Sequence, residues 1–222
     1  MRLKNLIVSV ACYIAVAVNA MGQEMEYKYE IGGLLGTSFY LGDANTNKLY
    51  KNSNLAGGVM FRYNINPRNS LKFDLCASGI SGDVKTAGTY IPERVGMNQE
   101  FNNTVWDLGC QYELSFWGYG TGKGFKGTKR LTPYIHFGLG FTYCNELCLN
   151  YPIGFGVRCK LAQRVNVGLD WAMHFATSDK LDGISDPYYI KSGFLKNKDT
   201  YCNTLLYLTY DICPKLRKCN ND

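Results

Sequence analysis

Two histidines, His136 and His174, are the side chains of this chain best suited to act as a general base near neutral pH. His174 is followed by Ser178 and Asp179, and a histidine paired with a serine or an aspartate can activate a nucleophile for hydrolysis. Both histidines fall on the polar side of an alternating segment, where a histidine is more often a hydrogen-bonded packing residue. The sequence therefore allows a dyad at His174 but favours a structural role.

Nine cysteines form the second group with reactive potential. Cys12 lies in an apolar N-terminal run, and the even number that remains permits disulfides in an exported protein. Cys144 and Cys148 form a lone C-x3-C, without the second pair of ligands that a zinc site needs. The two flank a three-residue turn, so both a disulfide and two free thiols fit this spacing. We expect three strand cysteines to act as small hydrophobes: Cys110, Cys159 and Cys202. We identify no metal site and no cofactor motif.

Four cations lie close together in the glycine-rich segment 118–131: Lys123, Lys126, Lys129 and Arg130. A flexible solvated loop explains them, and so does a surface that docks an acidic partner. Elsewhere the basic residues are interleaved with strand residues, and the net charge of +6 is moderate. We therefore expect no nucleic-acid partner.

The elements that must position these residues are β-strands. Apolar and polar residues alternate with a period of two in four segments, which excludes helices there: 71–78, 106–116, 151–161 and 165–175. Four further strands are expected at 27–41, 55–65, 132–143 and 201–212. The segments exceed the usual strand length and approach the roughly 9–11 residues that cross a tilted bilayer. The predicted fold class is all-β, an eight-stranded antiparallel transmembrane β-barrel of OmpA/OmpX-like size.

The polar face of these strands carries both signs of charge. Such side chains could pair inside a barrel whose apolar face meets lipid, as a lumen charge network: Arg62, Lys72, Asp74, Asp107, Glu113, Arg158, Lys160 and Asp170. Aromatic residues near the predicted strand ends suit interfacial girdles: Tyr63, Trp117, Tyr134, Tyr143 and Tyr151. The alternative is a soluble, lipocalin-like barrel with its apolar face inside.

The connections alternate between short ones, such as 66–69 and 162–163, and long ones at 42–54, 80–100 and 176–200. Outer-membrane barrels have short periplasmic turns and long external loops, which places both termini in the periplasm. Segment 118–131 is the exception, because it is a long connection on the predicted periplasmic side. This position is what makes its four cations a candidate docking element.

The N-terminus has the pattern of a secretory signal. Arg2 and Lys4 precede an apolar run from Leu6 to Val18, and Ala20 supplies a small residue at the cleavage position. The run is shorter than the roughly 20 residues of a membrane-spanning helix. We expect a signal peptide at 1–20, an outer-membrane barrel at 21–212 and a short periplasmic tail at 213–222.

An ordered series of short motifs resembles a known family over most of residues 27–212. The pieces are Tyr40-Leu41-Gly42-Asp43, Tyr63-Asn64-Ile65-Asn66-Pro67-Arg68, Thr132-Pro133-Tyr134-Ile135, Phe137-Gly138-Leu139-Gly140, Pro152-Ile153-Gly154-Phe155-Gly156-Val157, Val167-Gly168-Leu169-Asp170-Trp171 and Asp179-Lys180-Leu181-Asp182-Gly183. Together they are similar to the PorG-like (DUF6089) outer-membrane proteins of Bacteroidota.

The resemblance implies a non-catalytic barrel of the type IX protein secretion system that anchors or docks the periplasmic ring complex. The implied partners are the PorK-like lipoprotein and the PorN-like protein of that ring, together with outer-membrane lipid. The alternative class is an outer-membrane hydrolase, a lipid A deacylase or an omptin-like protease, using a histidine in the lumen or at its rim.

Overall fold

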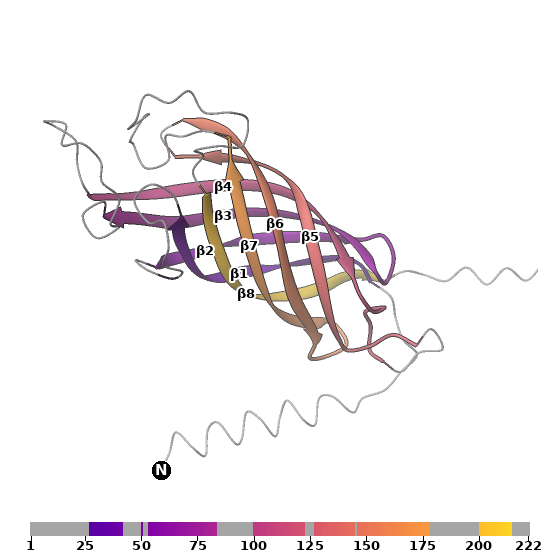
Figure 1. Cartoon of the computed structure of the whole chain (residues 1–222). Helices are drawn as coiled ribbons and strands as arrows, with labels where there is room; N and C mark the ends of the chain where they lie inside the picture. The colour runs from indigo at the N-terminus through magenta and orange to yellow at the C-terminus, as the bar shows by residue number, and fades with distance from the viewer. Residues whose placement is uncertain are drawn as a thin grey trace, which may run out of the picture.

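A computed structural model describes residues 27–41, 50, 53–83, 100–122, 127–144, 146–177 and 200–214. These residues form a closed barrel in which each strand pairs with its neighbours in sequence (Figure 1). The strands are β1 (Tyr27–Leu41), β2 (Asn54–Asn64), β3 (Asn69–Asp83), β4 (Glu100–Ser115), β5 (Leu131–Tyr143), β6 (Leu147–Lys160), β7 (Val165–Ala176) and β8 (Thr200–Pro214). The predicted eight-stranded antiparallel barrel is confirmed. No helix in the described part of the chain is long and apolar enough to cross a membrane.

Pairing between β1 and β8 closes the sheet, from Tyr27 opposite Pro214 to Leu41 opposite Thr200. One end of the barrel carries the short β2–β3 and β6–β7 turns, the β4–β5 connection, the start of β1 and the end of β8; we call it the turn end. The opposite end, where β3 ends and β4 begins, is called the loop end. With every strand paired on both sides, the barrel has no open sheet edge.

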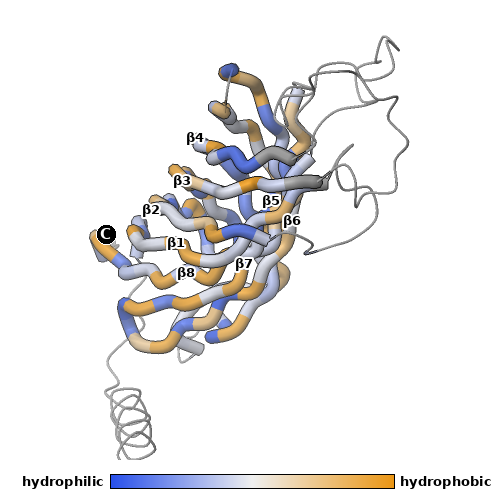
Figure 2. The backbone as a smooth tube through the Cα atoms, turned by 90° about the vertical axis from the view of Figure 1, so that its left-hand side faces the viewer, coloured by the Kyte–Doolittle hydropathy of each residue, from blue (hydrophilic) through white to orange (hydrophobic). Residues whose placement is uncertain are grey.

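Alternation along the strands separates a polar interior from an apolar exterior, and Figure 2 shows it as alternating colours along the tube. Outward side chains such as Leu35, Leu55 and Phe155 are 62%, 73% and 57% exposed. Every exposed strand residue among those described is uncharged. The charged side chains that the structure describes on β2, β3, β4, β6 and β7 point inward and are buried. The barrel thus has the reverse of the arrangement expected for a soluble barrel.

Glycines allow the strands to come close on the inside of this narrow barrel. A Cβ added at Gly36 would overlap the carbonyl oxygen of Thr204 on β8, and one added at Gly138 would overlap that of Cys110 on β4. Both glycines face the lumen, where the curvature of the sheet is tightest. By contrast, a Cβ added at the outward-facing Gly33 would have no neighbour nearer than 3.8 Å.

The outer face is covered by the chain itself at the loop end of β1 and β8. Phe39 and Cys202 face outward but are fully buried. Tyr50, which precedes β2, lies against Phe39 with 4.6 Å between ring centroids, and its hydroxyl is 2.9 Å from that of Thr204. The exposed apolar surface of β1 and β8 therefore begins on the turn-end side of Phe39 and Cys202.

Three sequence expectations need correction. β3 and β4 extend further than predicted, which shortens the expected 80–100 connection to residues 84–99. β8 ends at Pro214, two residues inside the predicted tail. Tyr134 is not part of an outer girdle: it shares the strand face of His136, and its side chain is buried in the lumen. The predicted signal peptide and most of the predicted tail lie outside the described residues.

We predict that Gly138→Ala destabilises the barrel, because the backbone of β4 would have to move away from the added methyl group. Overpacking of this kind costs about 1–3 kcal/mol or more. Gly33→Ala, on the outer face, is the matched control and should unfold like the unmutated protein. Denaturant unfolding of the refolded barrel, followed by tryptophan fluorescence, measures both; equal midpoints for the two variants would contradict the crowding argument.

Candidate functional site: a packed lumen and the surface of the turn end

The interior is held together by ion pairs between strands, the first centred on Arg62 of β2. Its guanidinium contacts Glu30 of β1 at 2.6 Å and Glu113 of β4 at 2.7 Å, and all three side chains are at most 1% exposed. The ring of Tyr207 lies 5.1 Å from the guanidinium carbon. Asn64 and Thr209 also donate hydrogen bonds to Glu30. One buried guanidinium is thus paired with two carboxylates, one that precedes it in the sequence and one that follows it.

A second ion pair joins Lys72 of β3 to Asp170 of β7, with 2.7 Å between Nζ and Oδ2. The other oxygen of Asp170 accepts a hydrogen bond from the Tyr134 hydroxyl at 2.9 Å and lies 3.1 Å from Nε2 of His136. Next to this pair, the amide of Gln111 donates to Asp74. His136 is therefore a partner of a buried carboxylate, in agreement with the structural role favoured by the sequence.

Asp107 of β4 is bound by neutral donors. Thr142 donates to its Oδ1 at 2.7 Å and Asn150 at 3.1 Å, and the Tyr201 hydroxyl donates to the same atom. Above this group, a cluster of buried apolar side chains closes the loop end: Tyr40, Ile80, Val105, Cys148, Ala176 and Tyr201. Asp107 is consequently shielded from solvent on that side.

His174 lies next to this cluster and is itself buried. Its ring stacks on Tyr201 with 4.6 Å between centroids, and its Nε2 is 3.4 Å from the side-chain nitrogen of Asn203. Ser178 and Asp179, the partners proposed for a catalytic dyad, lie outside the described residues. The contacts that the structure gives His174 are those of a packing residue.

At the turn end, Tyr119 of the β4–β5 connection enters the barrel mouth. Its hydroxyl donates to Asn166 at 2.7 Å, and the guanidinium carbon of Arg158 lies 4.1 Å from the ring centroid. Lys160 is 5.2 Å from the same centroid and pairs with Asp211 at 2.6 Å. Burial raises the pKa of Tyr119 well above its ordinary value, so the phenol remains a neutral donor. Tyr119 thus fills the lumen at the turn end.

The described residues of the β4–β5 connection are held to the barrel and to one another by hydrogen bonds. Backbone hydrogen bonds join Tyr119 N to Pro67 O at 2.8 Å and Lys129 N to Gly118 O at 2.7 Å. The ammonium group of Lys129 lies 4.1 Å from the Trp117 ring centroid, and Arg130 donates to the Thr121 carbonyl at 2.9 Å. These contacts give the described part of the connection a fixed conformation.

The structure places all eight residues of the predicted lumen network inside the barrel. Sequence reasoning missed three members, Glu30, Asp211 and Tyr119. Of the predicted docking cations, Lys129 and Arg130 lie at the turn end, and Lys123 and Lys126 are outside the described residues. The two cysteines of the C-x3-C, Cys144 and Cys148, pack against the cluster at the loop end, and the disulfide between them stays a prediction. Among the described residues, no group of three or more His, Cys, Asp or Glu side chains could hold a metal ion.

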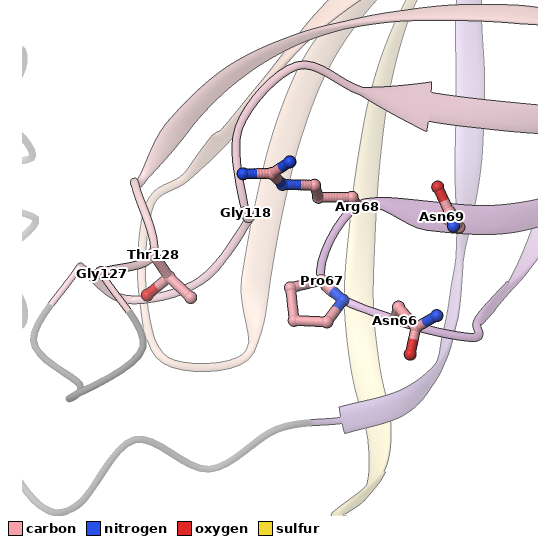
Figure 3. Close-up of a pocket in the computed structure, with 7 residues that line it drawn as sticks. All are labelled: Asn66, Pro67, Arg68, Asn69, Gly118, Gly127 and Thr128. Carbon is pink, nitrogen blue, oxygen red and sulfur yellow. The ribbon is translucent and has the colours of Figure 1, made fainter.

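A hollow of about 400 Å³ opens at the turn end between the β2–β3 turn and the β4–β5 connection (Figure 3). The first wall is formed by Asn66, Pro67, Arg68 and Asn69, and the second by Gly118, Gly127 and Thr128. The side chain of Arg68 is exposed and extends toward the opposite wall. At this hollow the exposed Arg68 borders a concave surface.

Comparison with known proteins gives one family match, "Domain of unknown function (DUF6089)", over residues 5–221. No curated protein matches the chain. Among solved structures, the N-terminal β-barrel domain of Pseudomonas aeruginosa OprF has a TM-score of 0.47 at 10% identity, over 85% of this chain and 99% of that domain. Neisserial surface protein A has a TM-score of 0.45 at 8% identity (84% and 97%), and Ail of Yersinia pestis, solved with sucrose octasulfate, 0.43 at 8% (86% and 100%).

We predict that Arg62→Met strongly destabilises the barrel, because it leaves Glu30 and Glu113 buried without their common cation. Breaking a buried ion pair in this way costs about 3–5 kcal/mol. Lys28→Met is the matched control: Lys28 lies over the rings of Tyr29 and Tyr63, and its removal strands no carboxylate among the described residues. Denaturant unfolding of both variants tests this, and equal losses would show that Arg62 acts as a packing residue only.

Proposed function

The chain belongs to the DUF6089 family, and from this premise we propose that it is a non-catalytic outer-membrane barrel that docks the periplasmic ring of a type IX secretion system. The observation that carries the proposal is the uncharged, largely apolar outer face of a closed barrel. In lipid, only helices and closed barrels satisfy the hydrogen-bonding capacity of all their backbone groups. A membrane barrel keeps its charged side chains in the lumen and presents an apolar face to the lipid. The outer membrane is the bilayer in which barrels of this kind occur.

The filled lumen supports a docking role rather than a pore. Side chains occupy it at successive levels, from the apolar cluster at the loop end through the pairs of Asp170 and Arg62 to Tyr119 at the turn end. A barrel of eight strands leaves little channel even before such filling. We therefore place the proposed binding of partners at one of the two ends of the barrel.

The turn end is the rim that faces the periplasm if the long loops are external, as in other outer-membrane barrels. There the exposed Arg68 and Lys129 provide positive charge on a folded surface. The partners that we propose for it, PorK-like and PorN-like ring proteins, follow from the family resemblance. The hydrolase alternative requires His174 to reach a substrate, and because its ring is buried beside Tyr201 we do not propose it.

Insertion into a membrane predicts a depth-dependent penalty for charge on the outer face. Leu169→Arg, near the middle of β7, should cost about 2–4 kcal/mol in lipid, whereas Leu161→Arg, just beyond β6 at the turn end, should cost about 0–1 kcal/mol. Unfolding of the two variants in lipid bilayers measures the difference. The unmutated protein should fractionate with outer membranes and migrate faster unboiled than boiled on a detergent gel; recovery as a soluble periplasmic protein would exclude the proposal.

Docking through the basic connection predicts loss of ring proteins when its cations are removed. Replacing Lys123, Lys126, Lys129 and Arg130 together by Ser should lower the yield of ring proteins on isolation of the complex from membranes, and the difference from the unmutated barrel should shrink as salt rises. Arg164→Ser, an exposed cation of the β6–β7 turn, is the control and should retain them. If the unmutated barrel is isolated without ring proteins, the proposed function fails. If the unmutated barrel and the fourfold variant retain the ring proteins at the same yield, another surface is the docking site.

A further inference from the structure

We propose that Arg164 and Tyr210, at the turn end of the outer face, form a binding site for the phosphate group of a phospholipid with net negative charge. The inference rests on the proposed function in one respect, which is that the outer face of the barrel meets lipid. It goes beyond that function in naming the site and the class of lipid.

The guanidinium of Arg164 is exposed on the β6–β7 turn and is held in place by two phenol groups. Its Nε donates to the Tyr27 hydroxyl of β1 and its Nη1 to the Tyr210 hydroxyl of β8, both at 3.2 Å. The guanidinium carbon lies 5.5 Å from the Tyr27 ring centroid. Because both partners are uncharged, they fix the position of the guanidinium and leave its positive charge uncompensated.

The fixed guanidinium keeps donors for a ligand. The N–H groups of its Nη2 make no hydrogen bond within the part of the chain that the structure describes, and Arg164 makes no ion pair there. The Tyr210 hydroxyl accepts from Nη1, and its own proton has no acceptor among the described residues. N–H and O–H donors beside a positive charge match an anion with several acceptor oxygens, which is the chemistry of a phosphate group.

Tyr210 lies at the edge of the apolar outer face. It is paired with Val165 of β7 and Ile31 of β1, and Leu206, earlier on β8, is paired with Leu169 near the middle of β7. The stretch from Leu206 to Tyr210 spans roughly 14 Å along the strand, or about 10 Å along the membrane normal at a tilt of about 40°. The apolar band of such barrels is about 25 Å tall, so the Tyr210 hydroxyl lies near the level of the lipid phosphates.

This position separates a lipid from other anions. A phosphate bound to Arg164 at the edge of the band would have its acyl chains beside the outward side chains of β7 and β8, and Leu206, Leu208 and Leu169 there are 52–58% exposed. Covering such surface stabilises the complex through the hydrophobic effect. A free phosphate ion or an acidic peptide has no acyl chains and gains nothing from this face.

The charge of the turn end selects among phospholipids. The carboxylates described at this end are Glu30, Glu113 and Asp211, and all three side chains are at most 2% exposed in the lumen. The described surface of the turn end therefore offers no carboxylate to the ammonium group of phosphatidylethanolamine. Phosphatidylglycerol has the same phosphate and no ammonium group, so we expect it to be the better ligand.

Two other cations at the turn end lie against aromatic rings. The ammonium group of Lys28 is 5.4 Å from the ring centroid of Tyr29, and that of Lys129 is 4.1 Å from the ring centroid of Trp117. Tyrosine and tryptophan are enriched at the head-group level of a membrane. Both contacts support placing this rim at that level. Arg164 is chosen for the test because two hydroxyls fix its charged group.

The test uses the full-length barrel refolded in dodecyl maltoside, a non-ionic detergent without phosphate, and titrated with dilauroylphosphatidylglycerol. Nuclear magnetic resonance follows the Nε–H of Arg164 and the backbone amide of Tyr210. Dilauroylphosphatidylethanolamine and glycerol 3-phosphate are the comparison probes. We expect saturable shifts with phosphatidylglycerol, binding of phosphatidylethanolamine weaker by about fivefold, and binding of glycerol 3-phosphate weaker by at least about tenfold.

Two variants remove different parts of the site. Arg164→Gln should weaken binding of phosphatidylglycerol about fivefold, which corresponds to about 1 kcal/mol for one cation at an anionic lipid surface. Tyr210→Phe keeps the ring and removes the hydroxyl, and it should weaken binding at least about twofold, the effect of one modest hydrogen bond. Faster migration of the unboiled sample on a detergent gel shows that each variant has folded.

Arg68→Gln is the matched control. It removes a guanidinium from the same end, but the Arg68 side chain extends across the hollow toward the β4–β5 connection (Figure 3), so the variant should bind phosphatidylglycerol like the unmutated barrel. Equal binding of phosphatidylethanolamine, equal binding of glycerol 3-phosphate, or equal weakening by Arg68→Gln and Arg164→Gln would each overturn the proposal.

Failure of the lipid site is distinguishable from failure of the proposed function. The titration uses purified barrel, so its result does not depend on whether ring proteins co-isolate with the protein. Recovery as a soluble periplasmic protein would remove the membrane role itself. Absence of the expected lipid preference in a barrel that fractionates with outer membranes would remove the lipid site alone.

Discussion

Closure of the sheet with eight strands is the constraint on which the rest of this structure depends. It pairs every strand on both sides, and it leaves an interior so narrow that side chains from opposite walls meet. Polar and charged residues that alternate into that space must therefore satisfy one another. The ion pairs of Arg62 with Glu30 and Glu113, and of Lys72 with Asp170, are the consequence. Those of Arg62 with Glu113 and of Lys72 with Asp170 join strands that are not neighbours in the barrel.

The lumen of this barrel is filled by described side chains that contact one another. Its most reactive groups are already engaged: His136 with Asp170, His174 with Tyr201, and Asp107 with three neutral donors. The same packing makes the barrel a rigid support for its two rims. At the turn end this support extends into the β4–β5 connection, since Tyr119 fixes that connection to the inside of the barrel.

The sequence predicts the strands and their faces well where alternation is unbroken, as in β6 and β7. The prediction fails where the local pattern does not show whether a side chain faces the lumen or the outside. Glu30 was missed because glycines interrupt the alternation of β1, and Tyr119 because a connection between strands has no periodicity. Which charges pair depends on strand register around the closed barrel: Lys72 and Asp170 are 98 residues apart, and local sequence does not specify their meeting.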